Sequence, residues 1–81
     1  MNDTEIYTAD ELARIEDDFI RHLVDLGGWR TDKPQMLFTG ERQIWDRWLA
    51  DGRLQRATKE RVSVVELTAA GWAWCREHGI G

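Results

Sequence analysis

The chain has 81 residues, of which 42% are hydrophobic and 32% are charged, and this composition is that of a soluble globular protein and excludes a disordered tail. A domain of this size buries only about 60 to 65% of the surface that its unfolded chain exposes, so one compact core and its surface must carry the function. No stretch of the sequence resembles a membrane span, and we expect no membrane partner.

The N-terminus and the cysteine count favour the cytoplasm. Residues 1–5 are acidic and lack both the basic region and the apolar run of a secretory signal. Cys75 is the single cysteine, which excludes an internal disulfide and fits the reducing interior of a cell. We therefore expect a cytoplasmic protein.

The formal net charge of −4 is distributed unevenly along the chain. Residues 1–27 hold eight acidic residues against two basic ones, whereas residues 28–61 hold eight basic residues against five acidic ones. The chain can therefore present a positive surface although it is acidic overall, and the same charges also suit the solvated faces of amphipathic elements. The eight basic residues are Arg30, Lys33, Arg42, Arg47, Arg53, Arg56, Lys59 and Arg61.

The first predicted helix begins after Thr8 and ends at Gly27 and Gly28. Thr8 and Glu11 have the spacing of a capping box, in which each side chain accepts from the backbone of the other residue. The apolar residues from Leu12 onward fall on one half of the helix and predict a buried face. Glu16 projects from within that face, and we expect a buried arginine or a tryptophan N–H as its partner.

The next segment predicts a connection over residues 29–38 and then a second full helix. Pro34 suits the first turn of a very short helix over residues 34–38, and Thr39 offers a second cap. The longer helix spans Glu41 to Asp51 and ends at Gly52. Its apolar arc consists of Ile44, Trp45, Trp48 and Leu49, and its opposite face displays Arg42, Gln43, Asp46, Arg47 and Ala50.

An antiparallel hairpin is predicted to follow, with strands over residues 53–58 and 61–67. The second strand contains the β-branched run Val62-Ser63-Val64-Val65, which favours extended backbone. Lys59 and Glu60 lack the glycine of a tight primed turn, so we expect a longer, mobile loop at the tip.

The last predicted helix begins after Thr68 as its cap and runs from Ala69 to His78. Trp72 and Trp74 lie on it two residues apart, which is about 200° of rotation, so both cannot face inward. We expect Trp72 to share the core face with Cys75 and Trp74 to point outward. An exposed tryptophan suggests a homodimer contact or a protein-binding patch.

Two segments resemble winged-helix regulators of the MarR and PadR type, over about half of the chain. They are Trp48-Leu49-Ala50-Asp51-Gly52-Arg53-Leu54, before a basic hairpin, and Leu67-Thr68-Ala69-Ala70-Gly71-Trp72, after it. The resemblance implies an α+β fold, a small winged-helix domain over residues 1–81. Its elements follow the order helix, short helix, helix, β-hairpin, helix. Residues 1–7 are a candidate disordered end. It also implies that residues 41–51 form the recognition helix and that Arg56, Lys59 and Arg61 lie in the wing.

The leading functional hypothesis is therefore a small transcriptional regulator that binds double-stranded DNA. Arg42, Gln43 and Arg47 have side chains that pair with guanine and adenine edges in the major groove. Phosphate contacts without sequence information are expected from Arg53, Arg56, Lys59 and Arg61.

The alternative is a non-catalytic protein-binding inhibitor or adaptor of the kind found on phages and other mobile elements, similar to anti-CRISPR proteins, on a winged-helix frame. The short second helix, the net acidity and the five tryptophans favour it.

The sequence offers little for catalysis or cofactors. It has no Gly-rich phosphate loop and no supported Ser-His-Asp set, so we expect no enzyme and no cofactor. Cys75 and His78 can supply half of a metal site, but only His22 remains as a further soft ligand, and we expect no metal.

Overall fold

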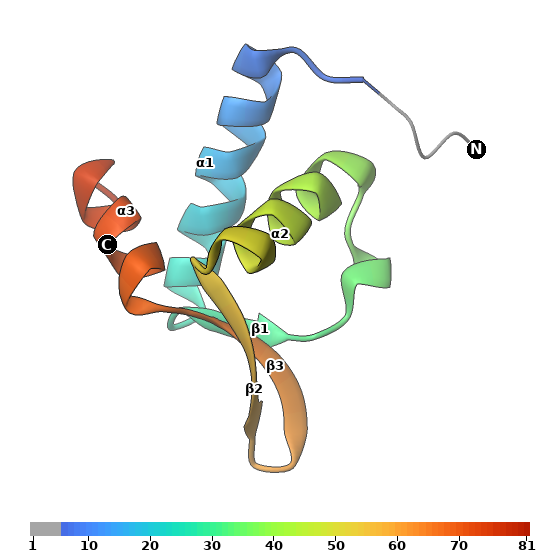
Figure 1. Cartoon of the computed structure of the whole chain (residues 1–81), viewed down its shortest axis with the longest axis vertical. Helices are drawn as coiled ribbons and strands as arrows, with labels where there is room; N and C mark the ends of the chain where they lie inside the picture. The colour runs from blue at the N-terminus through green and yellow to red at the C-terminus, as the bar shows by residue number, and fades with distance from the viewer. Residues whose placement is uncertain (1–5) are drawn as a thin grey trace.

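The structure, a computed structural model, describes residues 6–81, and over this range it contains three α-helices, one 3-10 helix and a three-stranded antiparallel sheet (Figure 1). The predicted α+β class is confirmed, and the order of the helices and the hairpin is compatible with the predicted one. The prediction on the order of residues 1–7 falls largely on residues 1–5, outside the described residues. The elements are α1 (Ala9–Asp25), β1 (Trp29–Thr31), η1 (Pro34–Met36), α2 (Thr39–Asp51), β2 (Leu54–Lys59), β3 (Val62–Leu67) and α3 (Ala69–Glu77).

The first helix begins and ends as its sequence predicts. The Thr8 backbone N–H donates to Glu11 Oε1 at 2.8 Å, and the Glu11 N–H donates to Thr8 Oγ1 at 3.1 Å, which confirms the capping box. Gly27 and Gly28 follow the helix at φ +102° and +89°, in the left-handed region that favours glycine. A Cβ on Gly28 would lie 2.4 Å from the Trp72 ring, so this corner also needs glycine for space.

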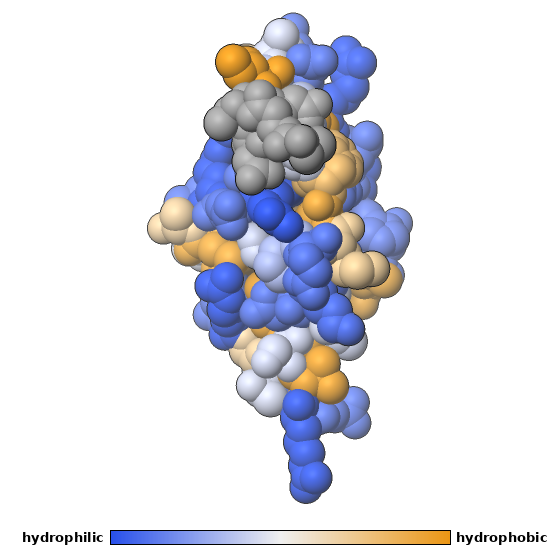
Figure 2. Space-filling view, turned by 90° about the vertical axis from the view of Figure 1, so that its right-hand side faces the viewer, coloured by the Kyte–Doolittle hydropathy of each residue, from blue (hydrophilic) through white to orange (hydrophobic). Residues whose placement is uncertain are grey.

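The core lies where α1, α2, the base of the hairpin and α3 meet. Phe19 of α1 packs against Trp45 of α2 with ring centroids 6.4 Å apart. In Figure 1, α2 crosses beside α1, and the hairpin extends away from both helices. Residues 58–63 at its far end are all exposed, and the tip is hydrophilic at the bottom of Figure 2. The buried core consists of Phe19, Ile20, Leu23, Leu37, Ile44, Trp45, Trp48, Leu54, Val65, Leu67, Cys75 and Ile80.

The sheet contains a strand that the sequence analysis does not predict. Its order is β1-β3-β2, so β3 pairs with both neighbours, and Arg30 of β1 lies opposite Val65 of β3. The strand β1 is only three residues long and largely exposed, and it carries no alternating apolar pattern. Its pairing with β3 joins segments that are far apart in the sequence. The hairpin itself is confirmed, with strand ends within one residue of those predicted.

The second long helix begins two residues earlier than predicted. Its N-cap is Phe38, whose backbone N–H donates to the Glu41 carboxylate at 3.4 Å, so the prediction of Thr39 as the cap is wrong. The early start places Gly40 in the first turn, where a Cβ would lie 2.7 Å from the Ile15 side chain of α1. The other predicted ends are confirmed: Gly52 ends α2 at φ +86°, and Thr68 Oγ1 accepts from the Gly71 N–H at 3.2 Å to cap α3.

Both tryptophans of α3 pack against other elements. The Trp74 ring meets Trp48 edge to face at 5.0 Å and stacks on His78 at 3.7 Å, and the Trp72 ring covers Gly28. Both residues are half-buried. The prediction that Trp74 points away from the core is therefore wrong. The short helix α3 lies at a junction, with the end of α2 on one side and the glycine corner on the other, so two of its faces are covered. A partner contact through Trp74 stays a prediction.

The hairpin closes through a tight two-residue turn, which corrects the expected longer loop. Lys59 pairs with Val62, and the two residues between them, Glu60 and Arg61, have φ angles of +50° and +70°. Positive φ at both central positions is the geometry of a primed turn, which matches the twist of the strands. The sequence places glycine at neither position, so the left-handed conformation is strained there.

Glycine at position 60 should therefore stabilise the fold. We expect Glu60→Gly to raise the free energy of unfolding by about 1 kcal/mol, because glycine adopts positive φ without the steric cost of a Cβ. Lys59→Gly is the matched control, since Lys59 lies in β2 outside the positive-φ residues, and there glycine should destabilise. Urea denaturation measures both, and equal losses in the two variants would contradict the turn geometry.

Candidate nucleic-acid interface

The outward face of α2 presents two arginines to solvent. Arg42 and Arg47 are exposed, and Gln43 between them is half-buried. Arg42 Nη2 donates to the Pro34 carbonyl oxygen at 3.1 Å, which links the helix to η1, whereas Arg47 forms no ion pair with another described residue. Asp46 lies exposed on the same helix between the arginines. The three residues predicted to read bases thus share one helix; the two arginines are exposed, and the Arg42 side chain is bonded to η1.

The cations of the hairpin are divided between its two faces. Side chains alternate along a strand, so Arg56 and Lys59, three residues apart in β2, point to opposite faces. Arg56 Nε lies 3.2 Å from Asp32 Oδ2, and Lys59 Nζ lies 3.7 Å from Glu66 Oε1. Arg61 lies in the turn, exposed and without an ion pair to any described residue. Of the predicted phosphate contacts on the hairpin, only Arg61 is unpaired over residues 6–81.

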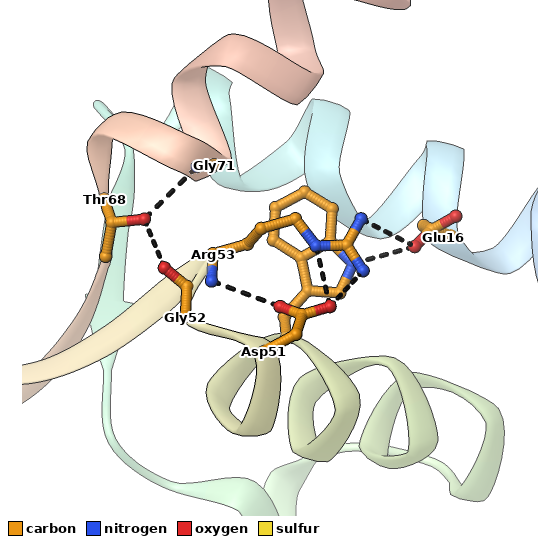
Figure 3. A network of polar contacts seen from close by, with 7 residues as sticks. Glu16, Asp51, Gly52, Arg53, Thr68 and Gly71 are labelled. Carbon is orange, nitrogen blue, oxygen red and sulfur yellow. Dashed lines mark hydrogen bonds and ion pairs between the residues drawn. The ribbon is translucent and has the colours of Figure 1, made fainter.

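Arg53 has a structural role that the sequence analysis does not predict. Its side chain is only 20% exposed, and its guanidinium carbon lies over the Trp48 ring, 4.4 Å from the centroid. Arg53 Nε donates to Asp51 Oδ2 at 2.9 Å, and Nη1 lies 3.9 Å from Glu16 Oε2 (Figure 3). Contacts inside the molecule thus occupy the Arg53 guanidinium, which leaves it unsuited to a phosphate contact.

Glu16 has both kinds of partner that its position in the apolar face predicts. Trp48 Nε1 donates to Glu16 Oε2 at 2.7 Å, and the Arg53 guanidinium lies on the same oxygen (Figure 3). The carboxylate side chain is 14% exposed. The prediction of a buried arginine or a tryptophan N–H as the partner of Glu16 is therefore confirmed, and this carboxylate belongs to the fold.

The same cluster holds the start of α3. Thr68 Oγ1 donates to the Gly52 carbonyl oxygen at 2.6 Å (Figure 3). The Thr68 N–H donates to the Arg53 carbonyl oxygen at 3.1 Å. A Cβ on Gly71 would lie 2.3 Å from that Arg53 oxygen, so only glycine permits α3 to approach. The Asp51-Gly52-Arg53 sequence at the end of α2 is the signal for this junction, because its acid and arginine flank the helix-ending glycine.

The side chains of Cys75 and His78, the remaining candidates for reactivity or metal binding, make contacts within the fold. Cys75 is fully buried, and burial raises the pKa of its thiol, which keeps it protonated and unreactive at neutral pH. The His78 ring stacks on Trp74, and its Nδ1 lies 2.8 Å from the Trp74 carbonyl oxygen. Over residues 6–81, no three side chains of the metal-binding types gather in one place.

In comparisons with known proteins, no family model matches the chain, and neither a curated protein nor a solved structure is significantly similar to it. Among the residues that the structure describes, no helix combines the length and the apolar character needed to cross a membrane.

Arg53 and Arg56 provide a matched test of the structural role. We expect Arg53→Gln to lower the free energy of unfolding by about 1 to 3 kcal/mol, because it removes a partner from the partly buried Glu16 carboxylate. Arg56→Gln, whose side chain is 62% exposed, should change it by less than about 1 kcal/mol. Guanidinium denaturation measures both values. Equal effects would show that Arg53 is an ordinary surface arginine.

Asp51 should make stability depend on pH in the acidic range. The hydrogen bond from the Arg53 side chain holds the pKa of the Asp51 carboxyl below its ordinary value. A lowered folded-state pKa contributes stability above the unfolded-state pKa, and this contribution is lost as pH falls through the folded-state value. We therefore expect Asp51→Asn to destabilise at pH 7, by less than about 1 kcal/mol because the pair is partly solvated. The difference from wild type should vanish under acid, and a constant difference in thermal denaturation from pH 7 to pH 2 would contradict the assignment.

Proposed function

We propose that this chain is a non-catalytic DNA-binding domain with a winged-helix frame, as its resemblance to MarR and PadR regulators implies. The observation that carries the proposal is the combination of an exposed polar helix face with a hairpin that follows it directly. Arg42 and Arg47 lie on the exposed face of α2, and Arg61 lies at the tip of the hairpin. All three are exposed, and none forms an ion pair with a described carboxylate.

In this proposal α2 is the recognition helix and the hairpin is the wing. Arg47 is the side chain for base reading, because guanidinium groups donate two hydrogen bonds to the O6 and N7 atoms of guanine. Arg42, held near the start of α2 by its bond to Pro34, and Arg61 are the phosphate contacts. The hydrophilic tip of the hairpin suits contact with the DNA backbone (Figure 2).

The charge balance of these elements predicts modest affinity. Glu41 and Asp46 are sequence neighbours of the two arginines of α2, and Arg47 also interacts electrostatically with Asp51. On the hairpin, Arg56 and Lys59 already have carboxylate partners. Counterion release scales with the number of phosphates neutralised, so the two phosphate contacts Arg42 and Arg61, not the four that the sequence suggests, set the salt dependence.

A salt titration on duplex DNA tests this proposal. We expect binding at low salt, with a plot of log K against log salt concentration that has a slope of about −1.8 for two phosphate contacts. Four contacts would give about −3.6. Fluorescence anisotropy of a labelled random duplex measures the slope. Absence of binding at low salt, or a slope near zero, would contradict the proposal.

Two arginine variants separate base reading from phosphate contact. Against a selected DNA site, Arg47→Ala should lose about 1 to 3 kcal/mol at one base position, because a bidentate pair is removed. Arg61→Ala should weaken all sequences alike and bring the slope about one closer to zero. Arg76→Ala is the charge-matched control, since Arg76 is exposed on α3, outside both the proposed recognition helix and the wing. A loss with Arg76→Ala equal to that with Arg47→Ala would refute recognition by α2.

The alternative function is that of a protein-binding inhibitor or adaptor on the same frame. The pairing of Arg56 and Lys59 with carboxylates favours it, because each pair neutralises a cation that a phosphate would otherwise attract. The short η1 in the place of a second full helix favours it too. Failure of the salt titration with a stably folded protein would select this alternative.

A further inference from the structure

An apolar groove lies beside β1, and none of its lining residues is among the proposed DNA contacts. Its volume is about 420 Å³, and it is bordered by the end of α1, by β1 and by η1. Three of its residues are large and apolar. They are Leu26, Trp29 and Met36, which are 46%, 38% and 72% exposed, respectively. The side of the molecule that carries η1 shows separate hydrophobic patches between hydrophilic residues (Figure 2). The lining residues are Leu26, Trp29, Arg30, Thr31, Lys33 and Met36.

The groove follows the open edge of the sheet. In the order β1-β3-β2, β1 has a partner on one side only. Three consecutive residues of β1 line the groove, and because their side chains alternate between the faces of the sheet, a groove that touches all three must run along the edge of the strand.

Backbone groups of β1 point into this edge. The Gly28 carbonyl accepts from Leu67 and the Asp32 N–H donates to Ser63, so these two residues face β3. Hydrogen-bonding direction alternates along an antiparallel strand, and the N–H and C=O groups of Trp29 and Thr31 therefore face away from the sheet. Lys33 already donates to the Thr31 carbonyl at 2.9 Å. The Trp29 N–H and C=O and the Thr31 N–H remain directed at the open edge.

The charges around the groove are positive. Arg30 is half-buried with its guanidinium carbon 5.6 Å from the centroid of the Phe19 ring, and Lys33 is exposed. Neither forms an ion pair with a carboxylate of residues 6–81. Asp32 between them is 17% exposed and is paired with Arg56, so it does not neutralise the groove.

We propose that the β1 edge binds an extended acidic peptide segment of a partner protein, which adds to the sheet as a fourth strand. Main-chain groups of Trp29 and Thr31 bond the peptide backbone, and an apolar side chain of the peptide fills the groove between Leu26 and Met36. Its carboxylates face Arg30 and Lys33, which selects acidic over basic segments. This surface is separate from the proposed DNA contacts, so either proposal can fail while the other stands.

Selection from a phage-displayed library of random linear peptides on the full chain tests this inference. We expect the recovered peptides to be rich in Asp and Glu with alternating apolar residues. A synthetic peptide of the selected sequence should shift backbone amide resonances of residues 26–36 in the protein. The proposal would be overturned if no peptide is recovered, if the peptides lack acidic enrichment, or if the shifts are confined to other residues. Stronger binding of oligo-dT to the same residues would also overturn it.

Variants at the edge separate strand addition from surface attraction. Thr31→Pro removes an edge-facing N–H and should weaken the peptide about three- to tenfold, a loss expected for one hydrogen bond. Lys33→Glu, at an exposed position where the fold is not at risk, should weaken it by a similar factor that shrinks with added salt. Met36→Ser should weaken the peptide without altering DNA binding, because it changes no charge. Unchanged peptide affinity in Lys33→Glu and Met36→Ser would rule out this groove.

Discussion

The fold depends on one partly buried carboxylate, that of Glu16, which lies in the apolar face of α1 with its side chain 14% exposed. A carboxylate in such a place is costly unless hydrogen bonds and a cation compensate for lost hydration. Here the Trp48 indole N–H and the Arg53 guanidinium meet the same oxygen, at 2.7 Å and 3.9 Å. Since the partners come from α2 and from the segment before β2, this carboxylate fixes α1 against both.

Arg53 extends the constraint to the rest of the molecule. Its side chain covers the Trp48 ring, which also contacts Trp74 of α3, and its carbonyl oxygen accepts from the backbone of Thr68. The end of α2, the start of the hairpin and the start of α3 therefore meet at one residue. Because the buried side of α2 is fixed there, its outward side and the direction of the hairpin are fixed as well. The two elements proposed to contact DNA, α2 and the hairpin, thus depend on the cluster around Glu16.

Local signals in the sequence predict much of this fold, whereas contacts between distant segments are not predicted. The Thr8 and Thr68 caps act within three residues, and Glu16 reveals its need for a partner by its place in an apolar face. The strand β1 forms only because β3 lies beside it, and the primed turn forms at Glu60 because strand twist overrides local preference.

The candidate site divides in the same way. The sequence identifies Arg42, Arg47 and Arg61 as exposed cations, but burial and pairing are tertiary properties. Alternation along the predicted strand puts Arg53 and Arg56 on opposite faces, but it does not indicate that Arg53 is the residue enclosed by the fold. The groove beside β1 also depends on a strand that the local pattern does not indicate.

A double-mutant cycle on Glu16→Gln and Arg53→Gln tests the central claim most directly. Glutamine at position 16 keeps an acceptor for the Trp48 N–H and removes the charge, so the cycle isolates the interaction between carboxylate and guanidinium. If the pair fixes α1 against the hairpin, the two losses in the free energy of unfolding should couple by about 1 kcal/mol or more. Losses that add to within about 0.3 kcal/mol would contradict it.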